Sequence, residues 1–319
     1  MRTLEHRLAR VRLAARRLRA RAGSVDPASV APSRLVLDLS KPGEAGDLTA
    51  PALRALLVDA VHWRGPLPVA VHVGHRGDHP HLPELVRFAH RLECPTLLVA
   101  DGPGLSATTA LALVDRGLAA LRLRVAGVTD AVQQDVLGTR ASDATDALVA
   151  FVEARRQRRV ALDIEIAVAW VQGVDTDLLA LAGWARQLGA DGFRLLAPHD
   201  PRRLPRRTDG LAALPRDAFH RTSPQTLRAL HAMHAHRDNG PGLPRSAAPL
   251  AWKALPCPVG GQRLVVRADH TVFACPHQPA IGRLERGLVA TWARAGEHLQ
   301  AIHGCSRRCA HLELAPEPA

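Results

Sequence analysis

A chain of 319 residues with 47% apolar side chains can bury one large core and a smaller one, which excludes a disordered protein. Its 42 Lys and Arg residues exceed the 30 Asp and Glu residues, and the resulting formal charge of +12 could attract phosphate groups. With no tyrosine and only 3% aromatic residues, however, few side chains can stack on bases, so we expect no nucleic-acid partner.

Residues 1–30 are predicted to contain a basic helix. Leu4, Leu8 and Leu18 form part of an apolar stripe among many arginines, and Gly23 is a natural stop. The segment has no apolar signal-peptide core, and no apolar run in the chain reaches the roughly 18–20 residues that a membrane span needs. We therefore expect a cytoplasmic protein without a membrane span.

Residues 31–200 are predicted to form an α/β domain, because short apolar runs alternate there with longer helical patterns. The expected strands are 35–39, 69–73, 96–100, 121–125, 161–169 and 192–196, and the expected helices are 50–62, 82–92, 106–116, 142–158 and 175–188. Ser106 and Ser142 are candidate N-caps, and Gly189 is a candidate helix stop. A helix between successive strands implies a parallel sheet with right-handed crossovers, either open and doubly wound or closed into a partial barrel.

The last third of the chain divides into two further segments. Residues 201–250 are rich in Pro and Arg and are expected to be a linker with one helix. Residues 251–319 are expected to form a small α+β domain, with a β-hairpin across 262–266 and 271–274 and a helix near 285–301.

This final segment contains four of the five cysteines, Cys257, Cys275, Cys305 and Cys309, separated by 17, 29 and 3 residues. An odd number of cysteines gathered at one end does not make a disulfide framework for a chain of this length. Four thiolates that converge can hold one iron–sulfur cluster or a structural zinc ion, so we predict a metal site formed by these cysteines.

The cysteine segment resembles the SPASM or twitch domain of radical SAM enzymes. The matching pieces are residues 257–260 (CPVG), 272–275 (VFAC), 281–284 (IGRL), Trp292 and 305–309 (CSRRC). The resemblance implies one auxiliary [4Fe–4S] cluster bound by the four late cysteines. The glycine that this family places five residues before its second cysteine is His270 here.

Residues 34–197 are similar to the partial (β/α)6 TIM-like barrel of the same superfamily. Residues 73–76 (VGHR) stand where the family has its GGE turn, and 100–102 (ADG) where it has TNG. In radical SAM enzymes a C-x₃-C-x₂-C motif after the first strand holds the cluster that binds and cleaves S-adenosylmethionine. Here that loop, residues 40–48, reads SKPGEAGDL, and its Glu44 and Asp47 are poor ligands for such a cluster.

The resemblance therefore implies a degenerate radical SAM-like protein that does not use S-adenosylmethionine. We expect an accessory or substrate-binding partner in peptide or natural-product modification, which binds a peptide or an active radical SAM homologue. A zinc-stabilised binding protein is an alternative that the cysteines alone leave open.

An enzyme with its chemistry at the barrel mouth is another alternative. His72, His75, His79 and His81 lie within ten residues, and the turn that carries them could be a metal site. Paired carboxylates could do acid–base work, and Asp101, Asp163, Glu165 and Asp191 occupy strand positions that could face a barrel interior, although ion pairs with arginine are the commoner role. Cys94 is expected to be a buried thiol.

Overall fold

The computed structural model describes residues 32–40, 48–169, 178–196, 263–274 and 279–296. The predicted basic helix, the 201–250 segment and the four late cysteines lie outside these ranges, as does most of the loop 40–48. The segment boundaries proposed from the sequence therefore stay predictions.

One sheet of nine strands organises the described residues, in the order β6-β5-β4-β3-β2-β1-β7-β8-β9. Its strands are β1 (Arg34–Asp38), β2 (Val69–Gly74), β3 (Thr96–Ala100), β4 (Ala120–Val125), β5 (Asp163–Ala169), β6 (Gly192–Leu196), β7 (Arg263–Arg267), β8 (Thr271–Phe273) and β9 (Gly282–Arg283). Strands β1 to β6 pair in parallel, which confirms the six predicted strands to within two residues at each end.

The described helices are α2 (Ala50–Arg64), α3 (Leu82–Arg91), α4 (Ala107–Asp115), α5 (Asp130–Leu137), α6 (Ala141–Arg158), α7 (Leu178–Gln187) and α11 (Leu288–Ala293), the last preceded by a 3-10 turn at Leu284–Arg286. Ser106 caps α4 as predicted, because its Oγ accepts a hydrogen bond from Thr109 N at 3.2 Å. The Ser142 cap is wrong: α6 begins at Ala141, and the Asp143 carboxylate accepts from Arg140 N at 3.1 Å instead. Helix α5 was not predicted.

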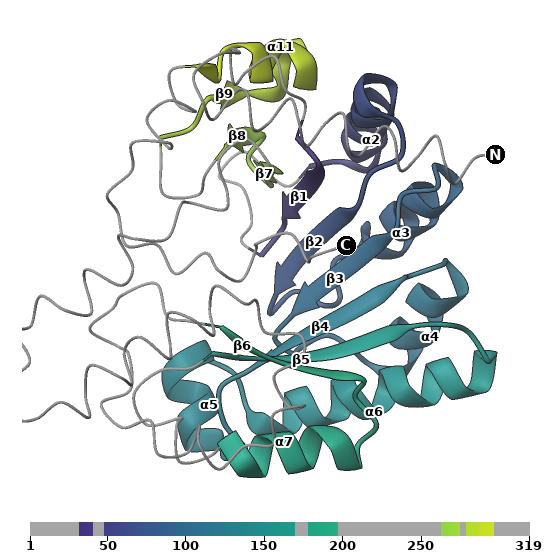
Figure 1. The fold of residues 1–319 in the computed structure, drawn as a ribbon, viewed down its shortest axis with the longest axis vertical. Coiled ribbons are helices and arrows are strands. Elements are labelled where there is room, and N and C mark those ends of the chain that lie inside the picture. The colour runs from purple at the N-terminus through teal and green to yellow at the C-terminus, as the bar shows by residue number, and fades with distance from the viewer. Residues whose placement is uncertain (1–31, 41–47, 170–177, 197–262, 275–278, 297–319) are drawn as a thin grey trace, which may run out of the picture.

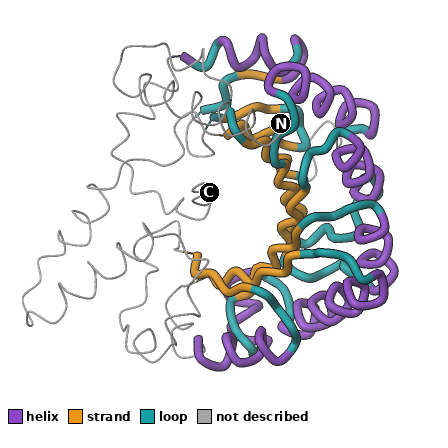
Figure 2. Tube along the Cα trace, turned by 45° about the vertical axis from the view of Figure 1, so that its right-hand side comes forward, coloured by secondary structure: helices purple, strands orange, loops and turns teal. Residues whose placement is uncertain are grey.

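The sheet is a partial barrel rather than an open doubly wound sheet. From β1 to β6 each strand is added to the same edge, so right-handed crossovers place every connecting helix on the same face. In a doubly wound sheet the strand order reverses once, and helices cover both faces. Figures 1 and 2 show the strands as a curved inner layer with the helices outside. The core lies between these two layers, where Leu123 and Ile166 of the strands join Leu148 and Phe151 of α6 in one buried cluster.

The C-terminal hairpin continues the barrel sheet. Strand β7 pairs in parallel with β1, with Leu264 opposite Leu35, and β8 returns antiparallel to β7. The hairpin turn contains His270 at φ 67°, the left-handed region that favours glycine. Trp292 of α11 is buried and meets Trp63 of α2 edge-on, with ring centroids 6.2 Å apart. The predicted hairpin is confirmed, and in addition it supplies a seventh parallel strand.

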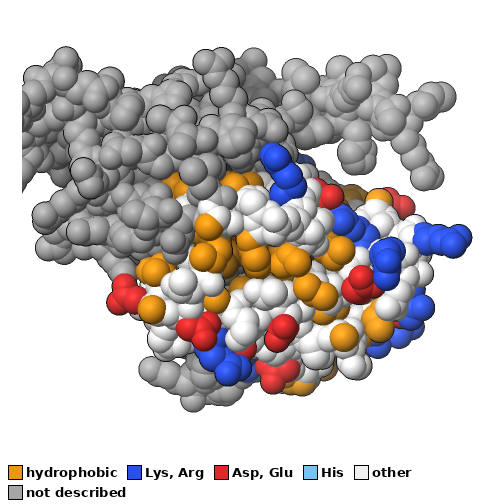
Figure 3. Space-filling view, turned by 90° about the horizontal axis from the view of Figure 1, so that it is seen from below, with side chains coloured by type: hydrophobic (Ala, Val, Ile, Leu, Met, Phe, Trp, Pro, Cys, Tyr) orange, Lys and Arg blue, Asp and Glu red, His pale blue; other side chains and the backbone are white. Residues whose placement is uncertain are grey.

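On the face seen in Figure 3, the described residues form neither an acidic nor a basic patch. Acidic and basic side chains lie there among hydrophobic ones. Among the described helices, none is both long and apolar enough to cross a membrane.

Candidate functional site

The inner face of the barrel carries the candidate site, because alternation along each strand separates it from the helix-side core. On β2, Val71 belongs to the core under the helices, whereas Ala70 belongs to a small inner cluster with Val36, Val265 and Phe273. The next inner layer is polar except at Val99. Its register partners run from Asp38 to His72, Val99, Arg122 and Glu165.

A buried ion cluster fills the β4–β6 side of this layer. Arg122 Nε lies 2.8 Å and Arg194 Nε 2.6 Å from Glu165 Oε1, and Arg194 Nη2 lies 3.1 Å from Oε2. Burial by itself would raise the pKa of Glu165, but the charges and hydrogen bonds of the two arginines outweigh it and lower that pKa. Glu165 therefore remains ionised at neutral pH, in the ion-paired role that the sequence favoured over acid–base work.

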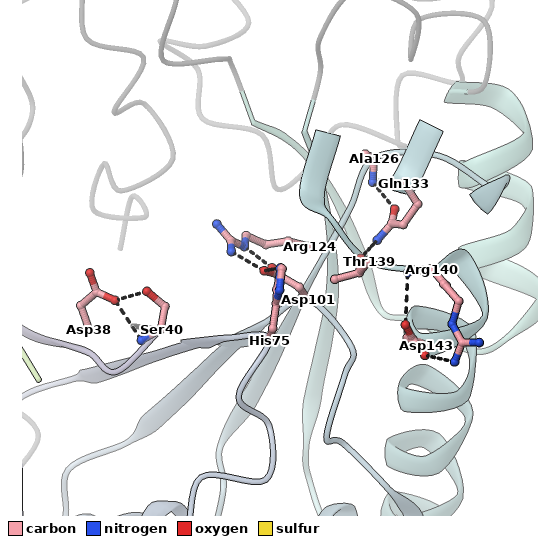
Figure 4. Close-up of polar contacts among 10 residues, drawn as sticks. All are labelled: Asp38, Ser40, His75, Asp101, Arg124, Ala126, Gln133, Thr139, Arg140 and Asp143. Atoms are coloured by element: carbon pink, nitrogen blue, oxygen red, sulfur yellow. Dashed lines mark hydrogen bonds and ion pairs between the residues drawn. The ribbon is translucent and has the colours of Figure 1, made fainter. Parts of the chain in front are cut away.

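A second ion cluster lies at the mouth, where the strands end (Figure 4). Arg124 of β4 binds Asp101 with two hydrogen bonds, Nε to Oδ1 at 2.5 Å and Nη2 to Oδ2 at 2.7 Å. The half-exposed His75 places its Nε2 3.3 Å from Asp101 Oδ2. Such a paired guanidinium holds the carboxylate in one orientation, so Asp101 is a fixed anchor between the β2 and β3 loops.

At the end of β1, two hydrogen bonds from Ser40 to Asp38 fix the turn. Ser40 donates its Oγ to Asp38 Oδ1 at 2.6 Å, and Ser40 N donates to the same oxygen at 3.2 Å. Gly74 adopts φ 57° directly beside this turn, and a Cβ on it would lie only 3.0 Å from Ser40 Cβ. The chain thus needs glycine at position 74, and β1 and β2 approach closely where the loop 40–48 begins.

Gln133 is a site residue that the sequence did not reveal. Its side chain is buried, its Oε1 accepts from Ala126 N at 2.8 Å, and its Nε2 donates to Thr139 Oγ1 at 2.9 Å. These bonds fix the turn after β4 and the end of α5 (Figure 4). A glutamine in a short helix that lacks a strong apolar stripe gives no signal of burial, which is also why α5 itself was missed.

The four histidines at 72–81 do not converge. His72 faces the barrel interior and His75 the mouth, whereas the buried His79 accepts a hydrogen bond from His81 N at 3.3 Å in the following turn. Within the described residues, no group of three or more His, Cys, Asp or Glu side chains could hold a metal ion. The four late cysteines of the predicted metal site lie outside those residues.

Two of the four candidate carboxylates do not belong to the polar layer. Asp191 lies before β6, where its Oδ2 accepts from Ile164 N at 2.9 Å and pairs with Arg155 of α6, so the expectation that it could face the interior is wrong. Asp163 is exposed at the start of β5, the end away from the mouth. Asp101 and Glu165 alone of the four take part in the buried inner clusters.

Cys94 lies at the opposite end of the barrel from the mouth. It is buried two residues before β3 begins, and burial raises the pKa of its thiol. A protonated, buried thiol at this edge is structural, as expected.

No sequence-family model matches this chain, and no curated protein matches it by sequence. Several solved structures, however, are similar to it in fold. SuiB from Streptococcus suis with bound S-adenosylmethionine has a TM-score of 0.62 at 12% identity, over 93% of this chain and 74% of SuiB. SuiB bound to the precursor peptide SuiA has a TM-score of 0.57 at 12% identity, over 87% of this chain and 69% of SuiB.

A third similar structure is anSMEcpe with bound AdoMet, at a TM-score of 0.52 and 12% identity, over 82% of this chain and 77% of anSMEcpe. These proteins are radical SAM enzymes. The chain therefore has a radical SAM-like fold, which confirms the fold class expected from the sequence.

Proposed function

We propose that this chain is a radical SAM-fold protein that does not cleave S-adenosylmethionine. Its role is that of an accessory, peptide-binding partner in peptide or natural-product modification. The observation that carries the proposal is the loop 40–48, SKPGEAGDL, which offers no cysteine and no histidine after β1. A cluster that binds S-adenosylmethionine would need three soft thiolate ligands in this loop.

The residues around this loop do not fit such a cluster either. Asp38 and Ser40 supply hard oxygen atoms at the end of β1, and they already bond to each other. Cys94 lies before β3 rather than after a strand, so it is at the opposite edge of the sheet. The other four cysteines all follow residue 256. The residues at the mouth instead hold one another in place, as Asp101 does with Arg124 and His75.

The late cysteines would have a separate role. Cys257, Cys275, Cys305 and Cys309 supply four thiolates, a donor set that fits one [4Fe–4S] cluster or a closed zinc site. Four protein ligands leave no open coordination position, so the group would be structural or, in the iron–sulfur case, would transfer electrons. Iron, acid-labile sulfide and zinc contents of the anaerobically purified protein separate these two possibilities.

A peptide partner is supported by one similar structure. SuiB has been solved with the precursor peptide SuiA bound, and it matches 87% of this chain. An inactive copy of this fold could present a peptide to an active homologue without performing chemistry itself. The proposed role therefore needs binding but no radical step.

The test is whether the protein produces 5′-deoxyadenosine. Anaerobically reconstituted protein is incubated with S-adenosylmethionine and dithionite, with SuiB as the positive control. A reaction without protein is the negative control, and a variant with the four late cysteines replaced by serine is run beside it. We expect no product above the protein-free reaction from either protein. Product that increases in proportion to the wild-type protein would overturn the proposal, whether or not the variant also forms it.

A further inference from the structure

The polar inner layer is buried at one end and accessible at the other. At the β4–β6 end, the side chains of Arg122, Glu165 and Arg194 are at most 6% exposed. At the β7–β1 end, the register partners Arg267 and Asp38 have side chains that are 43% and 30% exposed. A ligand can therefore reach the inner face where β7 pairs with β1.

Arg267 and Asp38 are each held by a different neighbour. The Arg267 guanidinium lies over the ring of Phe273, 4.2 Å from the ring centroid. Asp38 Oδ1 accepts two hydrogen bonds from Ser40 (Figure 4). Phe273 belongs to the small apolar cluster of the inner face, so the two charged groups border an apolar floor. These contacts leave Asp38 Oδ2 and Arg267 Nε available for other partners.

The two charged groups do not form a hydrogen bond with each other. Asp38 Oδ2 lies 4.0 Å from Arg267 Nε, and neither atom makes a hydrogen bond within the described part of the chain. A similar set on the outer surface is different. There Arg54 lies over the Phe88 ring, at 5.9 Å, and its Nη2 donates to Glu84 Oε1 at 2.8 Å, although both side chains are exposed. Exposure alone therefore does not explain why the inner pair is open.

An acceptor and a donor side by side select a ligand with the opposite pair of groups. In an extended peptide, the N–H and the C=O of one residue point to the same side, as they do toward a neighbouring antiparallel strand. The N–H can donate to Asp38 Oδ2 while the C=O accepts from Arg267 Nε–H, and hydrogen bonds to charged groups are the stronger ones. A simple anion or cation would be attracted by one member of the pair and repelled by the other.

We propose that Asp38 and Arg267 bind the backbone of an extended peptide at the inner face of the barrel, with Asp38 Oδ2 as the acceptor and Arg267 Nε–H as the donor. The inference rests on the proposed function, since it names the residues that would hold the peptide expected there. The primary amide of an Asn or Gln side chain carries the same N–H and C=O pair, so the test separates these two sources.

Four small probes test which groups the site recognises. Full-length protein labelled with ¹⁵N-arginine is titrated with N-acetylalanine N-methylamide, the backbone probe, at up to tens of millimolar. Methyl O-acetyllactate is its match, because it keeps the shape and the carbonyl groups but has oxygen in place of both N–H groups. Propionamide presents a primary amide, and free alanine presents an ammonium and a carboxylate group. The Arg267 Nε signal is assigned from its loss in Arg267→Met.

We expect the backbone probe to shift the Arg267 Nε resonance in a saturable way, and the ester probe to bind about tenfold more weakly, the typical loss of one hydrogen bond to a charged group. Asp38→Ala should weaken binding of the backbone probe by a similar factor. Glu84→Ala removes the carboxylate of the outer pair, and as the matched control it should leave the affinity unchanged. If Asp38→Ala does not fold, the comparison of amide and ester probes on the wild type still decides.

The proposal is overturned if the backbone probe does not shift the resonance, or if the ester probe binds as tightly as the backbone probe. Tighter binding of propionamide would assign the site to an amide side chain, and tighter binding of alanine would assign it to a free amino acid; either result would contradict the proposal. Equal losses in Glu84→Ala and Asp38→Ala would also contradict it. None of these outcomes depends on 5′-deoxyadenosine formation, so this inference and the proposed function can fail separately.

Discussion

The two faces of the barrel sheet are stabilised by different interactions. On the helix side, Leu121, Leu123 and Ile166 pack into one apolar cluster with the surrounding helices. On the inner side, the same strands contribute Arg122, Arg124 and Glu165, which are held by ion pairs. The first face is stabilised by removal of apolar area from water, whereas the second depends on every charge having its partner.

The sharpest way to break this comparison is to remove the central carboxylate of the inner face. Glu165→Ala leaves the buried guanidinium groups of Arg122 and Arg194 without their shared anion. We expect unfolding to become easier by about 3–5 kcal/mol, the usual cost of breaking a buried ion pair, as measured by urea denaturation. Glu153→Ala, which removes a half-exposed carboxylate on α6, should change little. Equal effects of the two variants would show that the inner cluster is not stabilising.

On the helix side, the expected loss has a different cause. Leu123→Ala on β4 leaves a cavity under α6, and such substitutions cost about 2–5 kcal/mol. The loss should be insensitive to salt, because no charge is removed. Val149→Ala, at an exposed position of α6, is the control and should be nearly neutral. A Leu123→Ala protein as stable as wild type would contradict the assignment of this face to the core.

The pH dependence of stability tests the polar layer more finely. His72 has a pKa of about 3 when folded against 6.5 for the ordinary side chain, so below pH 6.5 the unfolded chain binds a proton that the folded chain does not. Stability is therefore lost as the pH falls from 6.5 toward 3, by about 2 kcal/mol at pH 5. In urea denaturation between pH 7 and pH 5, we expect the stability of His72→Gln not to show this loss. Glu165 titrates below this pH range. Identical pH dependence in the two proteins would show that His72 is not buried as a neutral group.

The difference between the faces also explains what the sequence could predict. The helix-side face repeats with the period of a strand, so all six barrel strands were located from their apolar runs. The partners of the inner face were not, because Arg122, Glu165 and Arg194 come together only through strand register over tens of residues. Periodicity identifies a strand, but it does not tell which charged side chain faces which.

Local sequence signals had a similar limit. Ser106 was correctly identified as a cap, but Ser142 was not, because α6 begins at Ala141, two residues before a helix capped by Ser142 would begin. The pairing of β7 with β1 brings together segments more than 200 residues apart, and no local pattern could indicate it. The resemblance to radical SAM enzymes predicted a partial barrel. Periodicity alone predicted a parallel sheet and did not distinguish an open sheet from a barrel.

The central claim is that a radical SAM-like barrel in this chain has no cluster that binds S-adenosylmethionine. The most direct measurement is the electron paramagnetic resonance spectrum of dithionite-reduced, anaerobically purified protein, recorded with and without S-adenosylmethionine. The account predicts two identical spectra, whether the late cysteines hold an iron–sulfur cluster or zinc. A cluster signal whose g values shift when S-adenosylmethionine is added would contradict it.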